Sequence, residues 1–449
     1  MSDTPDVTGK LARCIFATRW EDVPANVRHQ AKRSFINLFA VALAGCRTDP
    51  VEIALASLAE FSGGRQATII GRIERIDALS AAFLNAAAAN VHDFCDTHLA
   101  TVIHPTAPVA PALLALAELK QVSGPDLLLA FILGNEVQAR IGLAISPHHY
   151  NKGWHITSTC GAFGAAAGSG RLLGLNERQL VSALGNASTQ SSGLCECLGW
   201  PAKSASVGNA ARNGLWSALL AEKGFGGPAD PLAGRQGFYN AMGDTPDLAK
   251  VTDGLGQSWE ILATSYKPYP CGFVIHPVLD CVLDWRKDYP AAEVMRVVVR
   301  GNPLLAHRTD RPDIATGRES QVSVQHAVAA ALVHGAAGLD QFTDACVVDP
   351  RVRALRSKVQ VLRDETFSTI AAAVEITTAD GVMHRLAQRA ARGSEVNPLS
   401  DQDLEAKLRT SAGAWNPKAD VTPLIDAIWT LDKSADVARL SSLAVPPLS

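Results

Sequence analysis

The sequence predicts a mainly α-helical protein, in which a large all-helical domain contains an inserted, smaller α+β lid domain. Apolar residues recur at helical spacing through the first half of the chain and again after about residue 400. β-branched runs lie only in the region between them. The segment KPYPCG (267–272) separates the two patterns, because two prolines and a glycine exclude a helix interior. We therefore expect an all-helical domain over 1–262 plus 393–449, and a lid domain over 263–392.

The helices of the first half carry their own start and stop signals. Pro24 begins a helix with an apolar stripe that ends at Gly45, and Asp77 is suited to cap the Ala-rich segment that follows it. A helix over 161–173 has glycines at 161, 164 and 168, which predicts a buried helix that a neighbouring backbone approaches closely. The other helices expected here cover 78–91, 108–120, 125–145, 204–221 and a segment that starts at Asn176.

The inserted region alternates between strand and helix signals. Residues 295–300 (MRVVVR) and 358–362 (KVQVL) are typical of strands, and a helix is expected over 321–334 with Gly335 as its stop. Asp380-Gly381 between two further short strands predicts a hairpin. After this region, Ser400-x-x-Asp403 begins another helix, and the chain stays helical to its end.

Composition excludes several classes of protein. The chain has 449 residues, 47% of them hydrophobic and 19% charged, with a net charge of −3, so neither a disordered chain nor a nucleic-acid binder is expected. No apolar run in the sequence approaches the ~18–20 residues that span a bilayer. The N-terminal segment MSDTPDVTGK lacks the basic region and the apolar core of a signal peptide. Nine cysteines without an export signal indicate reduced thiols. We expect a cytoplasmic protein that binds no membrane.

The densest polar cluster lies between His92 and His104. It contains three histidines and two aspartates in thirteen residues and directly follows an Ala-rich helix. Such a cluster can be a solvated helix end, but its concentration of titratable groups favours a functional site. A metal site is the alternative, since Asp93 and Asp96 could share a helix face. No partner ligands at matching spacing are evident elsewhere, so we expect no metal.

A second cluster surrounds His155, where an apolar helix begins. A lone histidine at a helix start is usually a cap or a core residue, but the free N–H groups of this helix could bind a substrate anion. Tyr150 is a candidate acid or hydrogen-bond donor, although a packing role is the simpler interpretation. Glu136 and Arg140 stand at i, i+4 in another apolar helix and predict a buried structural ion pair.

Two lysines complete the candidate set. Lys203 precedes a long apolar helix, and Lys267 lies in KPYPCG with His276 downstream; the plain alternatives are a snorkelling surface lysine and a proline-rounded linker. The sequence has no phosphate loop, dinucleotide fingerprint or serine-hydrolase elbow. Lysines with histidines suit a small anionic substrate, because the cations stabilise an enolate-like charge while a histidine moves the proton. The pattern predicts cofactor-free proton abstraction next to a carboxylate.

Seven collinear motifs that together cover nearly the whole chain resemble the MmgE/PrpD family. The matching segments run from His92 to Glu118, Gly134 to Ile145, Gly153 to Gly168, Leu184 to Leu194, Ala202 to Gly214, Lys267 to Asp280 and Glu319 to Gly335. The resemblance implies a helical domain with an α+β lid, a homodimer, and an active site between the two domains. It implies no cofactor and a small polycarboxylate as substrate.

The resemblance also implies roles for individual residues. His104 and His155 would be the acid/base pair, Lys203 and Lys267 would hold substrate carboxylates, and Asp93 and Thr97 would orient their neighbours. Gly272 stands where the decarboxylase branch of the family carries a histidine, and it is open whether His276, further on, reaches the site. The lid tyrosine of the family has no secure match within 302–311.

Several reactions therefore remain open at this point. We expect a dehydratase of the 2-methylcitrate type, with an epimerase of the iminodisuccinate type as the close alternative because both begin with the same proton abstraction. A cis-aconitate-type decarboxylase and an all-helical metal phosphohydrolase built on His92 and Asp93 are less favoured. A helical scaffold without catalysis is the remaining alternative.

Overall fold

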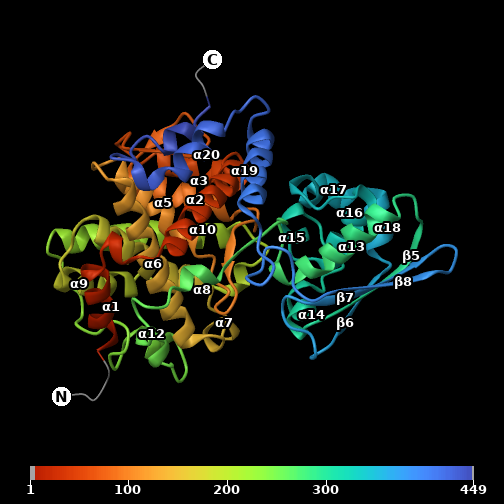
Figure 1. Cartoon of the computed structure of the whole chain (residues 1–449), viewed down its shortest axis with the longest axis horizontal. Helices are drawn as coiled ribbons and strands as arrows, with labels where there is room; N and C mark the ends of the chain where they lie inside the picture. Colours follow the sequence, from red (N-terminus) through yellow and green to blue (C-terminus); the bar gives the residue numbers. More distant parts are fainter. Residues whose placement is uncertain (1–5, 447–449) are drawn as a thin grey trace. The chain divides into compact units, whose positions relative to one another are not determined.

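The computed structural model describes residues 6–446, which form two compact units (Figure 1). The first unit contains the described residues up to Val91, Cys95–Thr264, and those from Asp401 onward. The second contains Ser265–Ser400 together with His92–Phe94, a short segment that the sequence assigned to the helical domain. Half of MSDTPDVTGK, residues 1–5, lies outside the described residues.

The first unit is built mainly from helices. They are α1 (Val7–Ala17), α2 (Ala25–Gly45), α3 (Asp49–Ala59), α4 (Ala78–Asn90), α5 (Thr106–Ala117), α6 (Gly124–Ile145), α7 (His148–Asn151), α8 (Ile156–Leu172), α9 (Glu177–Ser188), α10 (Ala202–Glu222), α11 (Phe238–Met242), α12 (Ala249–Thr252), α19 (Asp401–Trp415) and α20 (Thr422–Trp429). The expected helix signals act as predicted: α2 begins after Pro24, and the Asp77 carboxylate accepts a hydrogen bond from the Ser80 N–H at the start of α4.

Helix α8 lies at the centre of this unit and packs against α5, α6, α9 and α10. Every residue from Ile156 to Gly170 is buried. A Cβ at Gly164 would lie 2.8 Å from the backbone oxygen of Gly134 on α6, and one at Gly168 would lie 2.9 Å from that of Ala130. The predicted small-residue ridge is therefore confirmed, because the backbones of α6 and α8 come closer than any side chain would allow.

The first unit is not entirely helical, which corrects one detail of the expected fold. Strands β1 (Ala67–Thr68) and β2 (Arg75–Ile76) form a short antiparallel pair, and β3 (Asp96–His98) lies in the segment that the sequence left without secondary structure. These strands are only two or three residues long, too short to show the period-2 alternation that identifies a strand. The broader prediction of a mainly α protein is confirmed, since 56% of the chain is helical.

Helix α6 corrects a second expectation. It is long and apolar enough to cross a membrane by length and composition, although no such run was expected. Its apolar window is 94% buried inside the structure, as in the core helix of a globular protein. The buried pair Glu136–Arg140, which the sequence predicted, lies within the same helix, and both side chains are at most 2% exposed.

The second unit combines a four-stranded sheet with helices. Its elements are α13 (His276–Asp288), β5 (Val294–Gly301), α14 (Pro303–Thr309), α15 (Gly317–Ser320), α16 (Val324–His334), α17 (Asp344–Val348), α18 (Pro350–Arg356), β6 (Val359–Arg363), β7 (Ala372–Thr378) and β8 (Met383–Gln388); β4 (Thr264–Tyr266) contains the boundary between the units. The strand order is β6-β5-β7-β8, with β5 and β6 parallel and the other pairs antiparallel.

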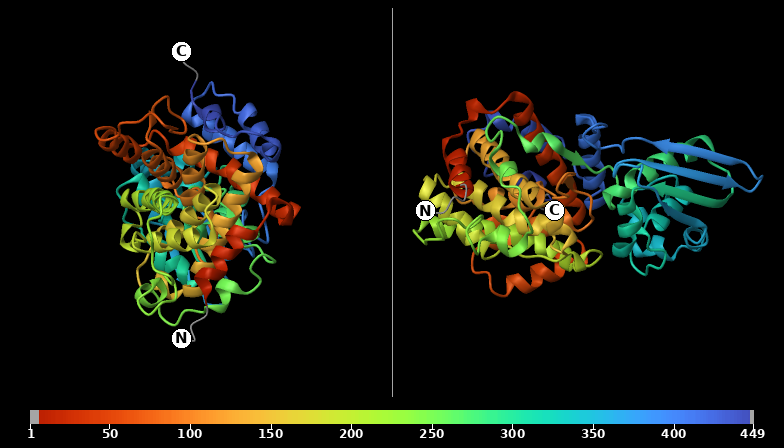
Figure 2. Two further views of the ribbon diagram at one scale, coloured as in Figure 1. Left: turned by 90° about the vertical axis from the view of Figure 1, so that its left-hand side faces the viewer. Right: turned by 90° about the horizontal axis from the view of Figure 1, so that it is seen from below.

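Helices α13 and α16 pack on this sheet, and Figure 2 shows helices gathered on one of its faces. Strand β7 alternates strictly, so that Val374 and Ile376 join Trp285 of α13 in one apolar core. The hairpin predicted at Asp380-Gly381 is present, and Gly335 ends α16 in the left-handed conformation, as expected. Helix α13 was not predicted. Its first turn directly follows the Pro-rich segment, and the sequence pattern does not separate the two.

Candidate functional site

The polar cluster that follows α4 is buried rather than solvated. Asp96 is fully buried, and His98 and His104 are at most 8% exposed. Burial raises the pKa of the Asp96 carboxyl to about 6, and that carboxyl accepts a hydrogen bond from the Thr106 hydroxyl. The solvated helix end is therefore the wrong interpretation of this segment.

The backbone of β3 determines which nitrogen of His104 carries a proton. Nδ1 of His104 lies 2.7 Å from the backbone oxygen of Asp96 and 3.2 Å from the Thr97 hydroxyl. A carbonyl oxygen can only accept, so Nδ1 must donate its proton to it. Neutral His104 then carries its lone pair on Nε2, so Nε2 is the ring nitrogen that can accept a proton.

His155 occupies the N-cap position of α8. Its Nδ1 lies 2.7 Å from the Ser158 hydroxyl, and its side chain is only 2% exposed. The first turn of the same helix also binds the other histidine, because the backbone N–H of His104 donates to the Thr157 hydroxyl at 3.0 Å. Both candidate acid/base residues are therefore attached to the first turn of α8, where free N–H groups favour an anion.

Lys203 lies in the first turn of α10, which packs along α8. Its side chain is 5% exposed, so the snorkelling surface lysine is the wrong interpretation. The Ser206 hydroxyl donates to the Lys203 backbone oxygen at 2.7 Å and lies 2.7 Å from the Ser158 hydroxyl. Hydrogen bonds therefore connect His155 with the backbone of Lys203, and His104 is bonded to Thr157 in the same turn of α8.

Asp93 and Lys267 form a buried ion pair in the second unit. The Lys267 ammonium lies 2.9 Å from Asp93 Oδ2 and 2.9 Å from the Asp93 backbone oxygen. Lys267 is 1% exposed and Asp93 is 6% exposed. The ammonium therefore binds both the carboxylate and the backbone carbonyl of Asp93. This pair also bears on the metal hypothesis, because a lysine already supplies the cation at the Asp93 carboxylate.

The structure places the other two candidates in different surroundings. His276 begins α13, is fully buried, and its ring stacks on Phe273 at 4.7 Å between centroids. Its role in substrate binding stays a prediction. Tyr150 lies in α7 and is half-buried, whereas its neighbour His149 is fully buried and bonds the Thr159 hydroxyl of α8 at 2.8 Å. Burial lowers the pKa of His149, as expected for a structural histidine.

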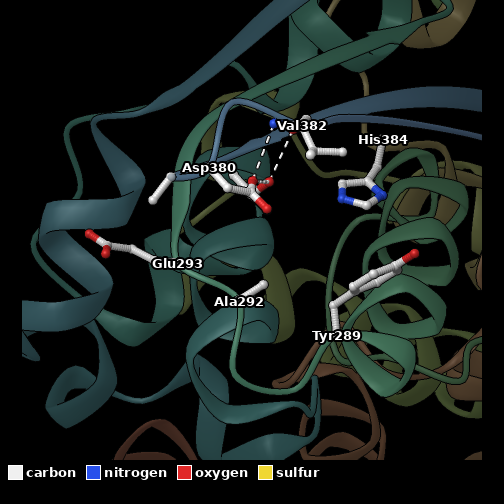
Figure 3. Close-up of a pocket in the computed structure, with 8 residues that line it drawn as sticks. Tyr289, Ala292, Glu293, Asp380, Val382 and His384 are labelled. Carbon is white, nitrogen blue, oxygen red and sulfur yellow. Dashed lines mark hydrogen bonds between the residues drawn. The ribbon is translucent and has the colours of Figure 1, made fainter.

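Among residues 6–446, no group of three or more histidine, cysteine, aspartate or glutamate side chains is arranged to hold a metal ion. All nine cysteines fall within this range, and none of them is paired in a disulfide. Figure 3 shows a cavity of about 490 Å³ at the edge of the sheet in the second unit, with Tyr289, Asp380 and His384 in its lining. It contains none of the candidate residues. The Asp380 carboxylate there is already bound by the Thr378 hydroxyl of its own hairpin.

Sequence reasoning missed the residues that position the histidines. Thr157, Ser158 and Ser206 are short hydroxyl side chains, which occur throughout any chain, and nothing marks them before their partners are known. Asp96 was noted as a possible metal ligand, but its backbone oxygen proves to be the group that contacts His104. A search for hydroxyl residues one turn after each candidate histidine or lysine would have found Ser158 and Ser206.

Comparison with known proteins defines the class of this chain. Residues 9–250 match the MmgE/PrpD N-terminal domain, and residues 269–432 match the MmgE/PrpD C-terminal domain. The chain belongs to the MmgE/PrpD family.

Several curated relatives are named as enzymes. A cis-aconitate decarboxylase-like protein of Aspergillus oryzae is 28% identical over 98% of both chains. The human cis-aconitate decarboxylase is 28% identical over 98% of this chain and 95% of its own. A mitochondrial 2-methylcitrate dehydratase of Yarrowia lipolytica is 26% identical over 58% of this chain and 53% of its own. Decarboxylases and dehydratases of this kind are lyases, so the comparisons support an enzyme of the lyase class.

Proposed function

We propose that this protein is a lyase that abstracts a proton next to a carboxylate of a small di- or tricarboxylate, and that the following step is loss of water. The observation that carries the proposal is that two buried histidines are bonded to the first turn of α8, His104 through its backbone N–H and His155 through its imidazole. In each ring Nδ1 takes part in a hydrogen bond, and we assign the proton transfer to Nε2.

The chemistry needs a base, an acid and a cationic surrounding. One imidazole takes the α-proton, and the electron pair of the broken C–H bond forms the alkene as the hydroxyl on the neighbouring carbon leaves with a proton from the second imidazole. The N–H groups at the start of α8 and the Lys203 ammonium stabilise the charge that develops on the substrate carboxylate. Thr97 holds the His104 ring, and Lys267 is the residue that we assign to a second carboxylate.

Decarboxylation is the second candidate. The curated relatives that align over 98% of this chain include several named as cis-aconitate decarboxylases, whereas the dehydratase aligns over 58%. Against it, Gly272 stands where we expect a histidine in the decarboxylase branch. An epimerase, which returns the proton to the opposite face, stays a third possibility. A homodimer and a cytoplasmic location also remain predictions.

Two substrates separate these reactions. The purified protein is incubated with 2-methylcitrate or with cis-aconitate, and alkene absorbance, CO₂ release and deuterium uptake from heavy water are followed together. Dehydration predicts new alkene absorbance from 2-methylcitrate without CO₂. Release of CO₂ from cis-aconitate establishes the decarboxylase instead, and deuterium uptake without alkene or CO₂ points to the epimerase. His104→Gln, which removes the proton carrier but retains a polar side chain, is the control for adventitious activity.

A further inference from the structure

We infer that Ser158 and Ser206 form a hydroxyl relay that holds His155 in its Nδ1–H tautomer and connects it to the backbone of Lys203. Ser158 follows His155 by three residues in α8, and Ser206 follows Lys203 by three residues in α10. The relay thus joins the starts of two helices that each carry a candidate active-site residue. Only its catalytic consequence rests on the proposed function; the tautomer itself does not.

The direction of the relay follows from counting protons. Ser206 donates its single hydroxyl proton to the Lys203 backbone oxygen at 2.7 Å, because a carbonyl cannot donate. The bond of 2.7 Å between the two serine hydroxyls must then use the proton of Ser158. Ser158 has no proton left for the imidazole, so the 2.7 Å contact requires a proton on His155 Nδ1. This arrangement satisfies all three bonds, and it also fits the longer contact of 3.3 Å between the Ser206 hydroxyl and His155 Nδ1, where Nδ1–H is again the donor.

The surroundings keep the relay in place. Ser158 is 1% exposed and His155 is 2% exposed, so bulk water competes little for their bonds. The backbone of Gly193 packs against both residues. The backbone N–H of His155 donates to the backbone oxygen of Gly193 at 3.0 Å, and a Cβ at Gly193 would lie 2.8 Å from the Cβ of Ser158. Gly193 has a φ of +130°, a conformation open to glycine and strained for other residues.

The relay has two consequences for the chemistry. First, neutral His155 carries its lone pair on Nε2. This nitrogen can act as the base and, once it is protonated, as the acid. The imidazolium is stabilised because its Nδ1–H polarises a chain of hydroxyls that ends on a carbonyl. Ser158 and Ser206 are therefore positioning residues that raise the basicity of His155 and hold it in register with the first turn of α10.

Substitution of Ser206 tests this with the covalent structure of the imidazole unchanged, although the Ser206 hydroxyl also lies 3.3 Å from His155 Nδ1. In Ser206→Ala, the Ser158 proton can turn toward Nδ1, so the Nε2–H tautomer becomes populated and the pKa of His155 falls. Ser206 is half-buried within a helix, where alanine is well tolerated. Ser204→Ala is the matched control: it removes the same atom in the same helical turn, and the Ser204 hydroxyl has no hydrogen-bond partner. Ser206→Thr restores the hydroxyl.

The readout is ¹⁵N NMR of protein labelled only at histidine, with the His155 signals identified by their loss in His155→Gln. Wild type, Ser204→Ala and Ser206→Thr are expected to show the Nδ1–H tautomer, and Ser206→Ala a mixture with a lower pKa. If the proposed lyase activity is present, Ser206→Ala should lower kcat by about 2- to 10-fold, the equivalent of one hydrogen bond, and shift the limb of the pH profile assigned to His155.

An Nε2–H tautomer in wild type, or a tautomer and pKa in Ser206→Ala that equal those of Ser204→Ala, overturns the relay. This outcome is separate from the reaction. If the Nδ1–H tautomer is found but lyase activity is absent, the proposed function is contradicted and the relay is supported. If lyase activity is found but His155 has the Nε2–H tautomer, the relay is contradicted and the proposed function is supported.

Discussion

The Lys267 ammonium contacts two oxygens of Asp93, its carboxylate and its backbone carbonyl, each at 2.9 Å. Asp93 can offer both because its backbone lies in the left-handed region, with a φ of 49°. Aspartate visits this region more readily than most residues, but the conformation still costs energy that the surrounding contacts must offset. The buried ion pair between Asp93 and Lys267 therefore holds the short segment His92–Phe94 in the second unit.

Breaking this pair should destabilise the protein strongly. Lys267→Met leaves the Asp93 carboxylate buried without its cation, and we expect a loss of about 3–5 kcal/mol in the free energy of unfolding. Lys287→Met is the matched control, since Lys287 also binds an aspartate at 2.9 Å but both side chains are at least 70% exposed. The control should change stability by less than about 1 kcal/mol in urea titrations. Equal losses in both variants would contradict the role given to burial.

A methyl group between α6 and α8 should also destabilise. Gly164→Ala forces the Gly134 carbonyl and α8 apart, because 2.8 Å is shorter than any real contact of a Cβ, and we expect a loss of about 1–3 kcal/mol. Gly413→Ala in α19 meets no atom within 4 Å and should instead gain up to about 1 kcal/mol from helix propensity. Thermal unfolding of both variants checks the contrast. A lower melting temperature for Gly164→Ala and an unchanged or higher one for Gly413→Ala would support the close approach of α6 and α8. Equal losses in both variants would contradict it.

Asp96 makes stability depend on pH. Its pKa is about 6 in the folded protein against 3.8 in the unfolded chain, so the folded state holds the proton more tightly. The stabilisation linked to Asp96 is complete below pH 3.8 and is lost as the pH rises through 6, a change of about 3 kcal/mol by pH 7. Asp96→Asn should lack this change. Urea unfolding of both proteins between pH 4 and 7.5 should give curves that diverge as the pH rises; parallel curves rule out the assignment.

Two buried histidines should respond to substitution in opposite ways. His104→Gln should abolish turnover because it removes the imidazole that we assign to proton transfer. It should affect stability little, because a glutamine amide can still donate to the Asp96 backbone oxygen. His149→Gln should lower the free energy of unfolding by about 1–3 kcal/mol and keep most of the activity, since both nitrogens of His149 are bonded within the fold, at 2.9 Å to Met242 and 2.8 Å to Thr159. Activity assays and urea titrations on both variants provide the check. Lost turnover in His149→Gln with unchanged stability would reverse the two roles.

The class of fold and the candidate residues could be predicted from local sequence patterns and residue types. Caps such as Asp77, the stop at Gly335 and the turn Asp380-Gly381 act through neighbours a few residues away, so a local pattern suffices to predict them. The ridge around Gly164 could be predicted for the same reason, since three glycines on one helix face already indicate a close approach. Sequence also identified His104, His155, Lys203 and Lys267 by their chemical type.

The partners of each candidate residue depend on packing between distant segments and could not be predicted in this way. The proton on His104 is placed by a carbonyl of β3, and the proton on His155 by hydroxyls from two different helices. The pairing of Lys267 with Asp93 joins residues 174 positions apart. Hydrogen bonds of this kind depend on distances of a few tenths of an ångström between distant segments, and these distances are set by the packing of helices and strands.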